Sequence, residues 1–146
     1  MSKLYETDFY AWTQQQSELL KKQAWEHVDI ANLIEEIESL WRQERRELRN
    51  RLEVLLAHLL KWQYQPDRRG KSWFSTIREQ RRKVNKVLQE NPSLKPYFSE
   101  GIAEAYESAK DLAVRETNLD YENFPETCLY TTEQILAEYF PNDQQQ

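Results

Sequence analysis

Basic residues are concentrated in the middle of the chain, where their side chains could bind phosphate groups. Residues 42–86 hold 14 basic and 5 acidic residues, whereas residues 1–41 and 87–146 are both acidic on balance. Guanidinium and ammonium groups form strong hydrogen bonds with phosphate, and nearby aromatic rings can stack on bases. The candidate phosphate surface consists of Arg68, Arg69, Lys71, Arg81 and Arg82, with the aromatic side chains of Trp62, Tyr64 and Trp73.

The same basic residues have a simpler interpretation, which is that acidic parts of the chain neutralise them. The formal net charge of the whole chain is -5, and a net acidic protein is an unpromising partner for nucleic acid. The acidic segment after residue 87 can pack beside the basic one, and Glu44 and Glu47 can pair with neighbouring arginines. We prefer this interpretation and keep phosphate binding as the alternative.

Residues that could catalyse a reaction or bind a metal do not occur in a recognisable pattern. Residues 35–38 include three glutamates, but di-iron sites in helical bundles need Glu-x-x-His motifs, which neither His27 nor His58 supplies. The single cysteine, Cys128, has no histidine expected nearby, and the sequence has no Gly-rich phosphate loop, HExxH or GxSxG motif. We therefore expect a non-enzymatic protein without a metal site or cofactor.

The elements that position these residues are expected to be helices. The chain has only two glycines and five prolines, and its apolar residues recur at helical spacing from Ile30 to Trp62. This pattern predicts a long helix over about 30–64, which Asp29 caps. The turn residues of segment 65–71 predict a reversal, so that helix 72–90 returns beside the long helix as a hairpin.

The remaining pattern completes an all-α bundle of four to five helices. An earlier helix is expected from Thr7 or Asp8 to about Gln23, and two later ones are expected at 93–117 and 132–140. We expect a single helical domain over residues 1–146, with a frayed tail at 141–146.

The long helix also suggests a surface for another protein. Trp41 lies where its apolar pattern thins into the charged run 42–47, and a projecting half-apolar helix can bind a partner or a second copy of the chain. The candidate interaction surface consists of Trp41, Arg42, Arg45 and Arg49.

The cellular location is expected to be the cytoplasm. No apolar run approaches the roughly 20 residues of a membrane-spanning helix, and the first residues do not show the pattern of a secretory signal. A single cysteine agrees with a reducing compartment.

Several segments resemble one known family in the same order along the chain. They are Tyr5–Trp12, Asn32–Leu40, His58–Pro66, Ser72–Trp73, Thr76–Arg81, Pro92–Lys95 and Thr132–Leu136. Over essentially its whole length the chain resembles the largely cyanobacterial domain-of-unknown-function family number twenty-nine. The resemblance implies a helical, intracellular protein and carries no established activity, catalytic residue or cofactor. Trp41 stands where that family usually has glycine, so the long helix can pack differently here.

Two functions follow as expectations. The first is a non-enzymatic interaction or assembly module, whose partner is another protein or a second copy of the same chain. The alternative is a regulatory protein that binds nucleic acid or a phosphate ligand, similar to an antitoxin, through the basic hairpin 42–86.

Overall fold

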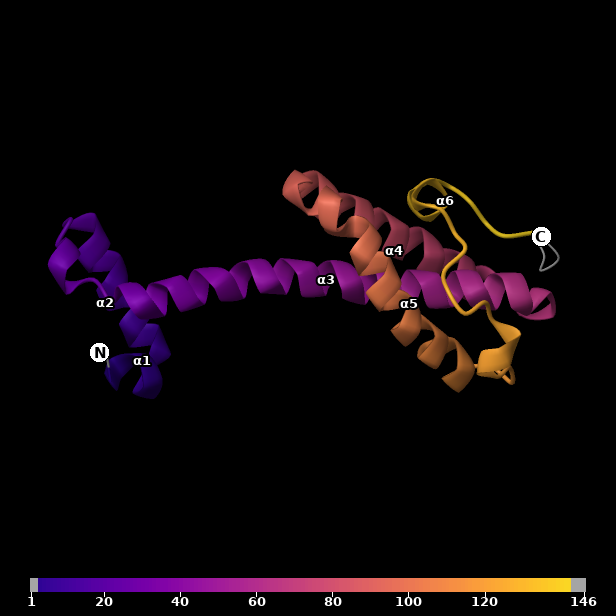
Figure 1. Ribbon diagram of the computed structural model, residues 1–146, viewed down its shortest axis with the longest axis horizontal. Helices are drawn as coiled ribbons and strands as arrows, with labels where there is room; N and C mark the ends of the chain where they lie inside the picture. Colours follow the sequence, from indigo (N-terminus) through magenta and orange to yellow (C-terminus); the bar gives the residue numbers. More distant parts are fainter. Residues whose placement is uncertain (1–2, 143–146) are drawn as a thin grey trace. The chain divides into compact units, whose positions relative to one another are not determined.

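The computed structural model describes residues 3–142, and every regular element in that range is helical (Figure 1). This confirms the predicted all-α class. The α-helices are α1 (Lys3–Thr7), α2 (Phe9–Lys21), α3 (Ile30–Tyr64), α4 (Lys71–Glu90), α5 (Phe98–Arg115) and α6 (Thr132–Leu136). Short 3₁₀ helices lie between them: η1 (Trp25–His27), η2 (Pro66–Arg68), η3 (Pro92–Tyr97) and η4 (Tyr121–Asn123).

The predicted bounds hold for the hairpin and shift elsewhere. The long helix runs over the predicted 30–64, and α4 begins one residue before the predicted 72. In place of a continuous helix 93–117, η3 forms the first turns and α5 spans Phe98–Arg115, because Pro96 disfavours the α-helical conformation of Lys95, the residue before it. The last helix ends at Leu136, well before the predicted residue 140.

The amino-terminal segment contains one helix more than predicted. α1 ends at Thr7, and the carboxylate of Asp8 accepts a hydrogen bond from the N–H of Ala11, at 3.1 Å, which makes Asp8 the cap of α2. The described residues therefore hold six α-helices against the expected four to five.

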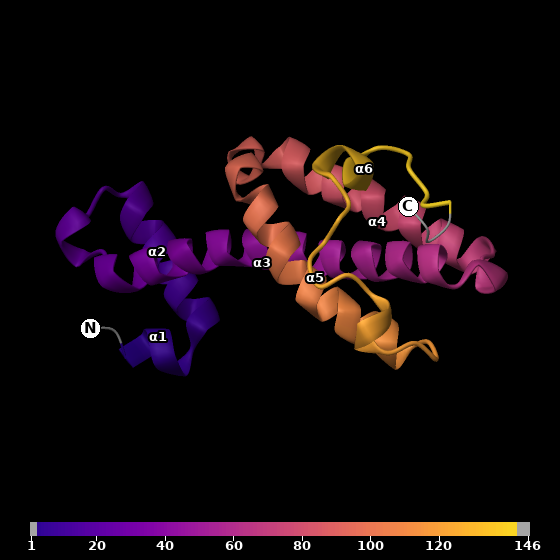
Figure 2. The ribbon, with the colours of Figure 1, turned by 45° about the vertical axis from the view of Figure 1, so that its right-hand side comes forward.

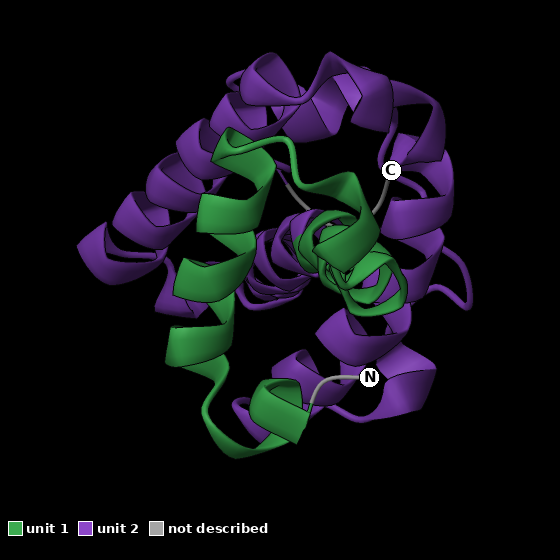
Figure 3. Ribbon diagram, turned by 90° about the vertical axis from the view of Figure 1, so that its left-hand side faces the viewer, with its two compact units in different colours: residues 1–43 green, residues 44–146 purple. Residues whose placement is uncertain are grey.

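Contacts divide the chain into two compact units, residues 1–43 and 44–146, shown in two colours in Figure 3. Helix α3 supplies its first part to one unit and its second part to the other. The first unit contains α1, α2 and α3 as far as Gln43, and its most buried side chain is that of Trp12. The single domain over the whole chain stays a prediction.

The second unit holds the main hydrophobic core. Helix α4 runs back beside the second part of α3, and α5 crosses α3 in both views (Figures 1 and 2). Small residues of α5, Ala105, Ala109 and Ala113, are buried where it packs. The α3 side chains in this core are fully or almost fully buried: Leu48, Leu52, Leu55, Leu56, Ala57, Leu59 and Leu60.

The carboxyl-terminal segment is packed as far as the structure describes it. Pro141 is buried, and the carbonyl of Asn142 accepts a hydrogen bond from Arg69 at 2.7 Å. The predicted fraying therefore does not apply to residues 141 and 142, because both are tied to the second unit. The rest of the predicted frayed tail, 143–146, lies outside the described residues. Within residues 3–142 no helix is long and apolar enough to cross a membrane.

Candidate functional site

A row of exposed apolar side chains lies along the first part of α3. Ile30, Ile34, Ile37, Leu40 and Trp41 each expose between 49% and 61% of their surface. Their spacing of three and four residues places them on one broad side of the helix. We call these five residues the N-terminal apolar face.

Helix α2 leaves this face uncovered because it is fixed mainly to the start of α3. The indole N–H of Trp12 donates to the carboxylate of Asp29 at 3.0 Å, and the backbone N–H of Asp29 donates to the side-chain oxygen of Gln16 at 2.8 Å. Farther along, a groove of about 410 Å³ separates the two helices. Its apolar lining is Trp12, Leu20, Leu33, Ile37 and Leu40.

Charged residues of the same helix segment pair with one another outside the apolar row. A guanidinium nitrogen of Arg42 lies 3.2 Å from the carboxylate of Glu35 and another lies 4.0 Å from that of Glu38. The hydroxyl of Tyr5 donates to Glu36, and this hydrogen bond raises the pKa of Tyr5 to about 12. The glutamates of residues 35–38 are thus engaged within the chain. Among the described residues, no group of three or more His, Cys, Asp or Glu side chains is placed to hold a metal ion.

The structure divides the candidate interaction surface between the two units. Trp41 belongs to the N-terminal apolar face, and the Arg42 guanidinium lies 5.9 Å from the centre of its ring. In the second unit, Arg45 lies over the ring of Tyr97 at 4.4 Å, and Arg49 donates to the Tyr97 hydroxyl at 3.0 Å. The two later arginines therefore contribute to packing inside the second unit.

Two arginines of the candidate phosphate surface bind the chain's own backbone. Arg69 donates to the carbonyls of Trp62 and Asn142 at 2.6 and 2.7 Å. The buried side chain of Arg81 donates to three carbonyls of the carboxyl-terminal segment, which belong to Gln134, Ile135 and Tyr139, at 2.8 to 3.0 Å. These guanidinium groups hold the last segment against α3 and α4.

The predicted stacking rings are also engaged in packing. Trp62 lies 5.0 Å from the ring of Phe140, Tyr64 lies 5.4 Å from Phe124, and the Lys61 ammonium lies 5.5 Å from the ring of Trp73. Three members of the surface remain exposed: Arg68 and Lys71 near the turn, and Arg82 about three turns along α4. The structure does not gather the eight predicted residues into one surface.

Acidic residues neutralise part of the basic hairpin, as the preferred interpretation predicts. Glu104 of α5 lies 3.7 Å from Arg49. The buried Lys61 pairs with Glu116, and this contact lowers the pKa of the Glu116 carboxyl. Within α4, Lys83 pairs with Glu79 at 2.9 Å.

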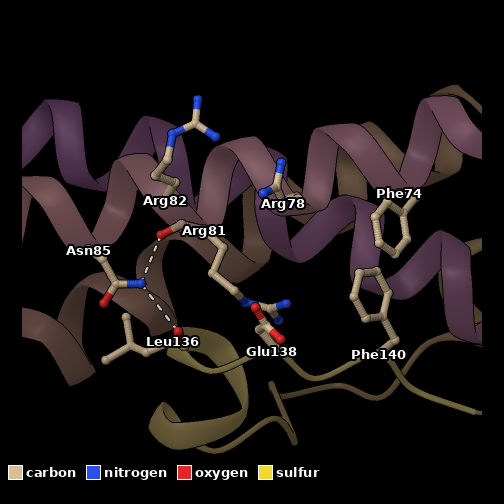
Figure 4. A pocket seen from close by; sticks show the side chains of 8 residues that line it. All are labelled: Phe74, Arg78, Arg81, Arg82, Asn85, Leu136, Glu138 and Phe140. Carbon is tan, nitrogen blue, oxygen red and sulfur yellow. Dashed lines mark hydrogen bonds between the residues drawn. The ribbon is translucent and has the colours of Figure 1, made fainter.

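A basic groove lies between α4 and the carboxyl-terminal segment (Figure 4). Its volume is about 570 Å³. One end is formed by Phe74 and Phe140, whose rings stack with centres 4.9 Å apart. The amide of Asn85 donates to the carbonyls of Arg81 and Leu136 at the other end, at 3.0 and 3.2 Å. We call this hollow the α4 groove, and its lining residues are Phe74, Arg78, Arg81, Arg82, Asn85, Leu136, Glu138 and Phe140.

Two arginines on the α4 side of this groove have exposed side chains. Arg78 and Arg82 make no hydrogen bond or ion pair with any residue that the structure describes, and both extend away from Glu138 in Figure 4. Glu138 instead faces the guanidinium of Arg81. Phe74 and Arg78 were not among the residues predicted from the sequence to form the candidate phosphate surface. Their four-residue spacing to each other and to Arg82 is a signal that could have placed the three on one side of α4.

One family model matches nearly the whole chain. The model of the family described as "Domain of unknown function DUF29" matches residues 4–141. The chain belongs to this family. The match covers nearly the whole chain and confirms the resemblance that the sequence segments indicated. Comparison with curated proteins and with solved structures gave no match.

In this DUF29 chain, the single cysteine and the histidine of the second unit lie in partly buried environments that disfavour their charged forms. The ring nitrogen Nδ1 of His58 lies 2.9 Å from the carbonyl of Val54, and burial lowers the pKa of the imidazole. Burial raises the pKa of the Cys128 thiol, which keeps it protonated and therefore weakly nucleophilic. The N-terminal apolar face and the α4 groove are the surfaces from which a function can be inferred.

Proposed function

We propose that this chain is a protein-interaction module that forms a homodimer through the N-terminal apolar face. The observation that carries the proposal is the row of five large apolar side chains that are each about half exposed. Burying the exposed part of such a side chain contributes about 1 kcal/mol, and contiguous apolar patches on soluble proteins commonly mark sites of protein contact.

The residue types on this helix support a second copy of the chain as the partner. Ile30 and Ile37 occupy equivalent positions of two successive heptads, and Leu33 and Leu40 occupy the other core positions. Isoleucine at the first core position and leucine at the second is the arrangement that favours pairing of two like helices. A face of this kind is self-complementary, as a twofold dimer requires.

The groove beside α2 provides further area for such a contact. Two heptads are too short for a stable coiled coil of single helices. A partner that also contacts Leu20 and the groove between α2 and α3 would bury more apolar surface. The proposed dimer is therefore a bundle of two α2–α3 hairpins rather than a pair of isolated helices.

The charges on this segment are compatible with burial of the apolar face. Glu35, Glu38 and Arg42 pair with one another on another side of the helix. The groove is also lined by Glu36, which accepts a hydrogen bond from Tyr5, and by Lys21, which lies 3.9 Å from Glu18. The dimer contact would therefore not bury a charged group without a partner in the chain, which would be strongly unfavourable.

Sedimentation velocity over a range of concentrations tests the proposal. The wild-type chain should sediment as a dimer that dissociates on dilution. Ile37→Glu should shift the equilibrium to monomer, because a carboxylate would be buried without a partner. Leu129→Glu is the matched control, since Leu129 is 71% exposed in the second unit, and it should leave the dimer unchanged.

Circular dichroism should show that the wild-type chain and both variants have the same helix content at the same protein concentration. A wild-type chain that sediments as a monomer at every concentration would contradict the proposal, and so would an Ile37→Glu variant that dimerises like the wild type.

The proposal places a non-enzymatic module in the cytoplasm, for which the single cysteine is a supporting feature. The alternative, a nucleic-acid or phosphate-binding regulatory protein that uses the whole candidate phosphate surface, has weaker support. Arg69 and Arg81 donate to the chain's own carbonyls, which leaves fewer basic groups of the candidate phosphate surface for a ligand.

A further inference from the structure

Helix α4 is the most basic element of an otherwise acidic chain. It contains six basic and two acidic residues, whereas the whole chain has a formal net charge of -5. Lys83 pairs with Glu79, and Arg81 faces Glu138 and donates to three backbone carbonyls. Arg82 also lies near Glu79 and helps to lower the pKa of that carboxyl, but neither Arg78 nor Arg82 forms an ion pair or hydrogen bond with another described residue.

Phe74, Arg78 and Arg82 follow one another along α4 and line the groove together. They are spaced by four residues, which on an α-helix corresponds to about 6 Å between successive members. The same three residues also line a neighbouring hollow of about 350 Å³, together with Glu79, whose carboxylate pairs with Lys83. The row is therefore accessible from two sides. The row therefore has an aromatic ring at one end, and two guanidinium groups follow it along the helix.

The aromatic end of the row has a surface available for stacking. One face of Phe74 is covered by the parallel ring of Phe140, with an angle of 4° between the rings, yet Phe74 keeps 45% of its surface exposed. Aromatic side chains of this kind stack on nucleobases, while arginine binds phosphate through paired N–H donors.

We propose that the α4 groove binds a nucleoside phosphate, with the base on Phe74 and the phosphates on Arg78 and Arg82. In a nucleotide the sugar separates the base from its phosphates, just as one helical turn separates Phe74 from Arg78. This proposal is independent of the homodimer, since every residue it uses lies in the second unit.

Isothermal titration calorimetry at low ionic strength tests the proposal with three probes: adenosine diphosphate, adenosine and inorganic pyrophosphate. Adenosine diphosphate should bind the wild-type chain more tightly than either of the other two, because only it engages both ends of the row. Pyrophosphate binding as tight as that of the nucleotide would overturn the role of Phe74, and absence of nucleotide binding would overturn the proposal.

Variants separate the two ends of the site. Replacing both arginines, Arg78→Gln with Arg82→Gln, should weaken nucleotide binding about 100-fold, or about tenfold for each guanidinium group that is removed. Phe74→Leu keeps an apolar contact for Phe140, and it should weaken nucleotide binding about tenfold while leaving pyrophosphate binding unchanged.

Arg46→Gln is the matched control, since Arg46 is an exposed arginine on α3 outside the groove, and it should bind like the wild type. A loss in the control equal to that in the double variant would show diffuse charge attraction and would overturn the site. A chain that sediments as a monomer but binds the nucleotide with this variant pattern would contradict the dimer alone.

Discussion

At the scale of single residues, arginines of the same basic hairpin have different roles because their surroundings differ. Arg49 bonds to Tyr97, Arg81 holds carbonyls around Ile135, and Arg78 is exposed in the α4 groove. The sequence shows that each residue is charged, but it does not show which arginines bind within the chain and which are exposed. The carbonyls that bind Arg81 lie more than 50 positions away, so only the fold decides which guanidinium is occupied.

Replacing Arg81 should loosen the carboxyl-terminal segment. Arg81→Met removes donors from three carbonyls, and we expect the free energy of unfolding to fall by about 3 kcal/mol, since each hydrogen bond from a charged group contributes about 1.5 kcal/mol or more and their effects overlap. Arg81→Lys should recover only part of this loss, because an ammonium group cannot replace the planar fork of a guanidinium. Urea denaturation measures the change.

Arg82→Met provides the comparison for that experiment. Arg82 is the neighbouring exposed arginine, and its replacement should change the free energy of unfolding by no more than about 0.5 kcal/mol. Hydrogen exchange should also become faster in residues 132–142 of the Arg81→Met chain and stay unchanged in the Arg82→Met chain. Equal stability of the two variants would show that the contacts of Arg81 are not stabilising.

At the scale of elements, the sequence predicted what depends on local pattern. The bounds of α3 and α4 were predicted closely, because an uninterrupted apolar period and a turn rich in Pro, Asp and Gly define them. It missed α1, which is a helix of only five residues, and the 3₁₀ geometry that surrounds Pro96.

Periodicity could not predict whether the apolar side of the first part of α3 is buried or exposed. The pattern identified Ile30, Ile34 and Ile37 as apolar positions of a helix in a bundle, where they would be expected to face inward. The structure leaves them about half exposed, since α2 packs mainly against the start of α3. A periodic sequence shows which side of a helix is apolar, but it does not show whether the same chain covers that side.

The junction between α2 and α3 depends on the side chain of Asp29. It accepts hydrogen bonds from the side chain of Asn32 and from the buried Trp12 indole. Asp29→Ala should loosen the hairpin, because the cap of α3 is lost and the indole N–H is left without its acceptor. We expect amide hydrogen exchange in α2 to become at least several-fold faster, as measured by mass spectrometry.

Asp29→Asn is the conservative comparison, since its amide oxygen can still accept hydrogen bonds and asparagine is a good helix cap. Exchange in α2 should stay close to the wild-type rate in this variant. Exchange in α4 and α5 should be unaffected by either change. Uniform acceleration throughout the chain in Asp29→Ala would contradict a local role for this junction.

At the scale of the whole molecule, the two units differ in what stabilises them. The hydrophobic core cluster is built from residues between Leu48 and Ile135, all of them in the second unit. In the described part of the first unit, the buried side chains are those of Trp12 and Gln16, and the other large apolar side chains are only partly buried or are exposed. A unit with so small a core of its own is one that a second copy can complete.

This difference predicts how the chain responds to division at residue 43. A fragment of residues 44–146 should unfold cooperatively at a urea concentration close to that of the full chain, because it keeps the entire core cluster. A fragment of residues 1–43 should have little helix when dilute and gain helix as its concentration rises, since association would bury the N-terminal apolar face.

Circular dichroism at several concentrations distinguishes this behaviour from simple instability of the first fragment. Ile37→Glu in residues 1–43 should abolish the gain of helix with concentration, because the introduced carboxylate disfavours burial of the same face. Helix content of the wild-type fragment that is independent of concentration would show that its apolar side does not bind a second copy. Loss of the cooperative transition in residues 44–146 would show instead that the second unit requires the first part of α3 to fold.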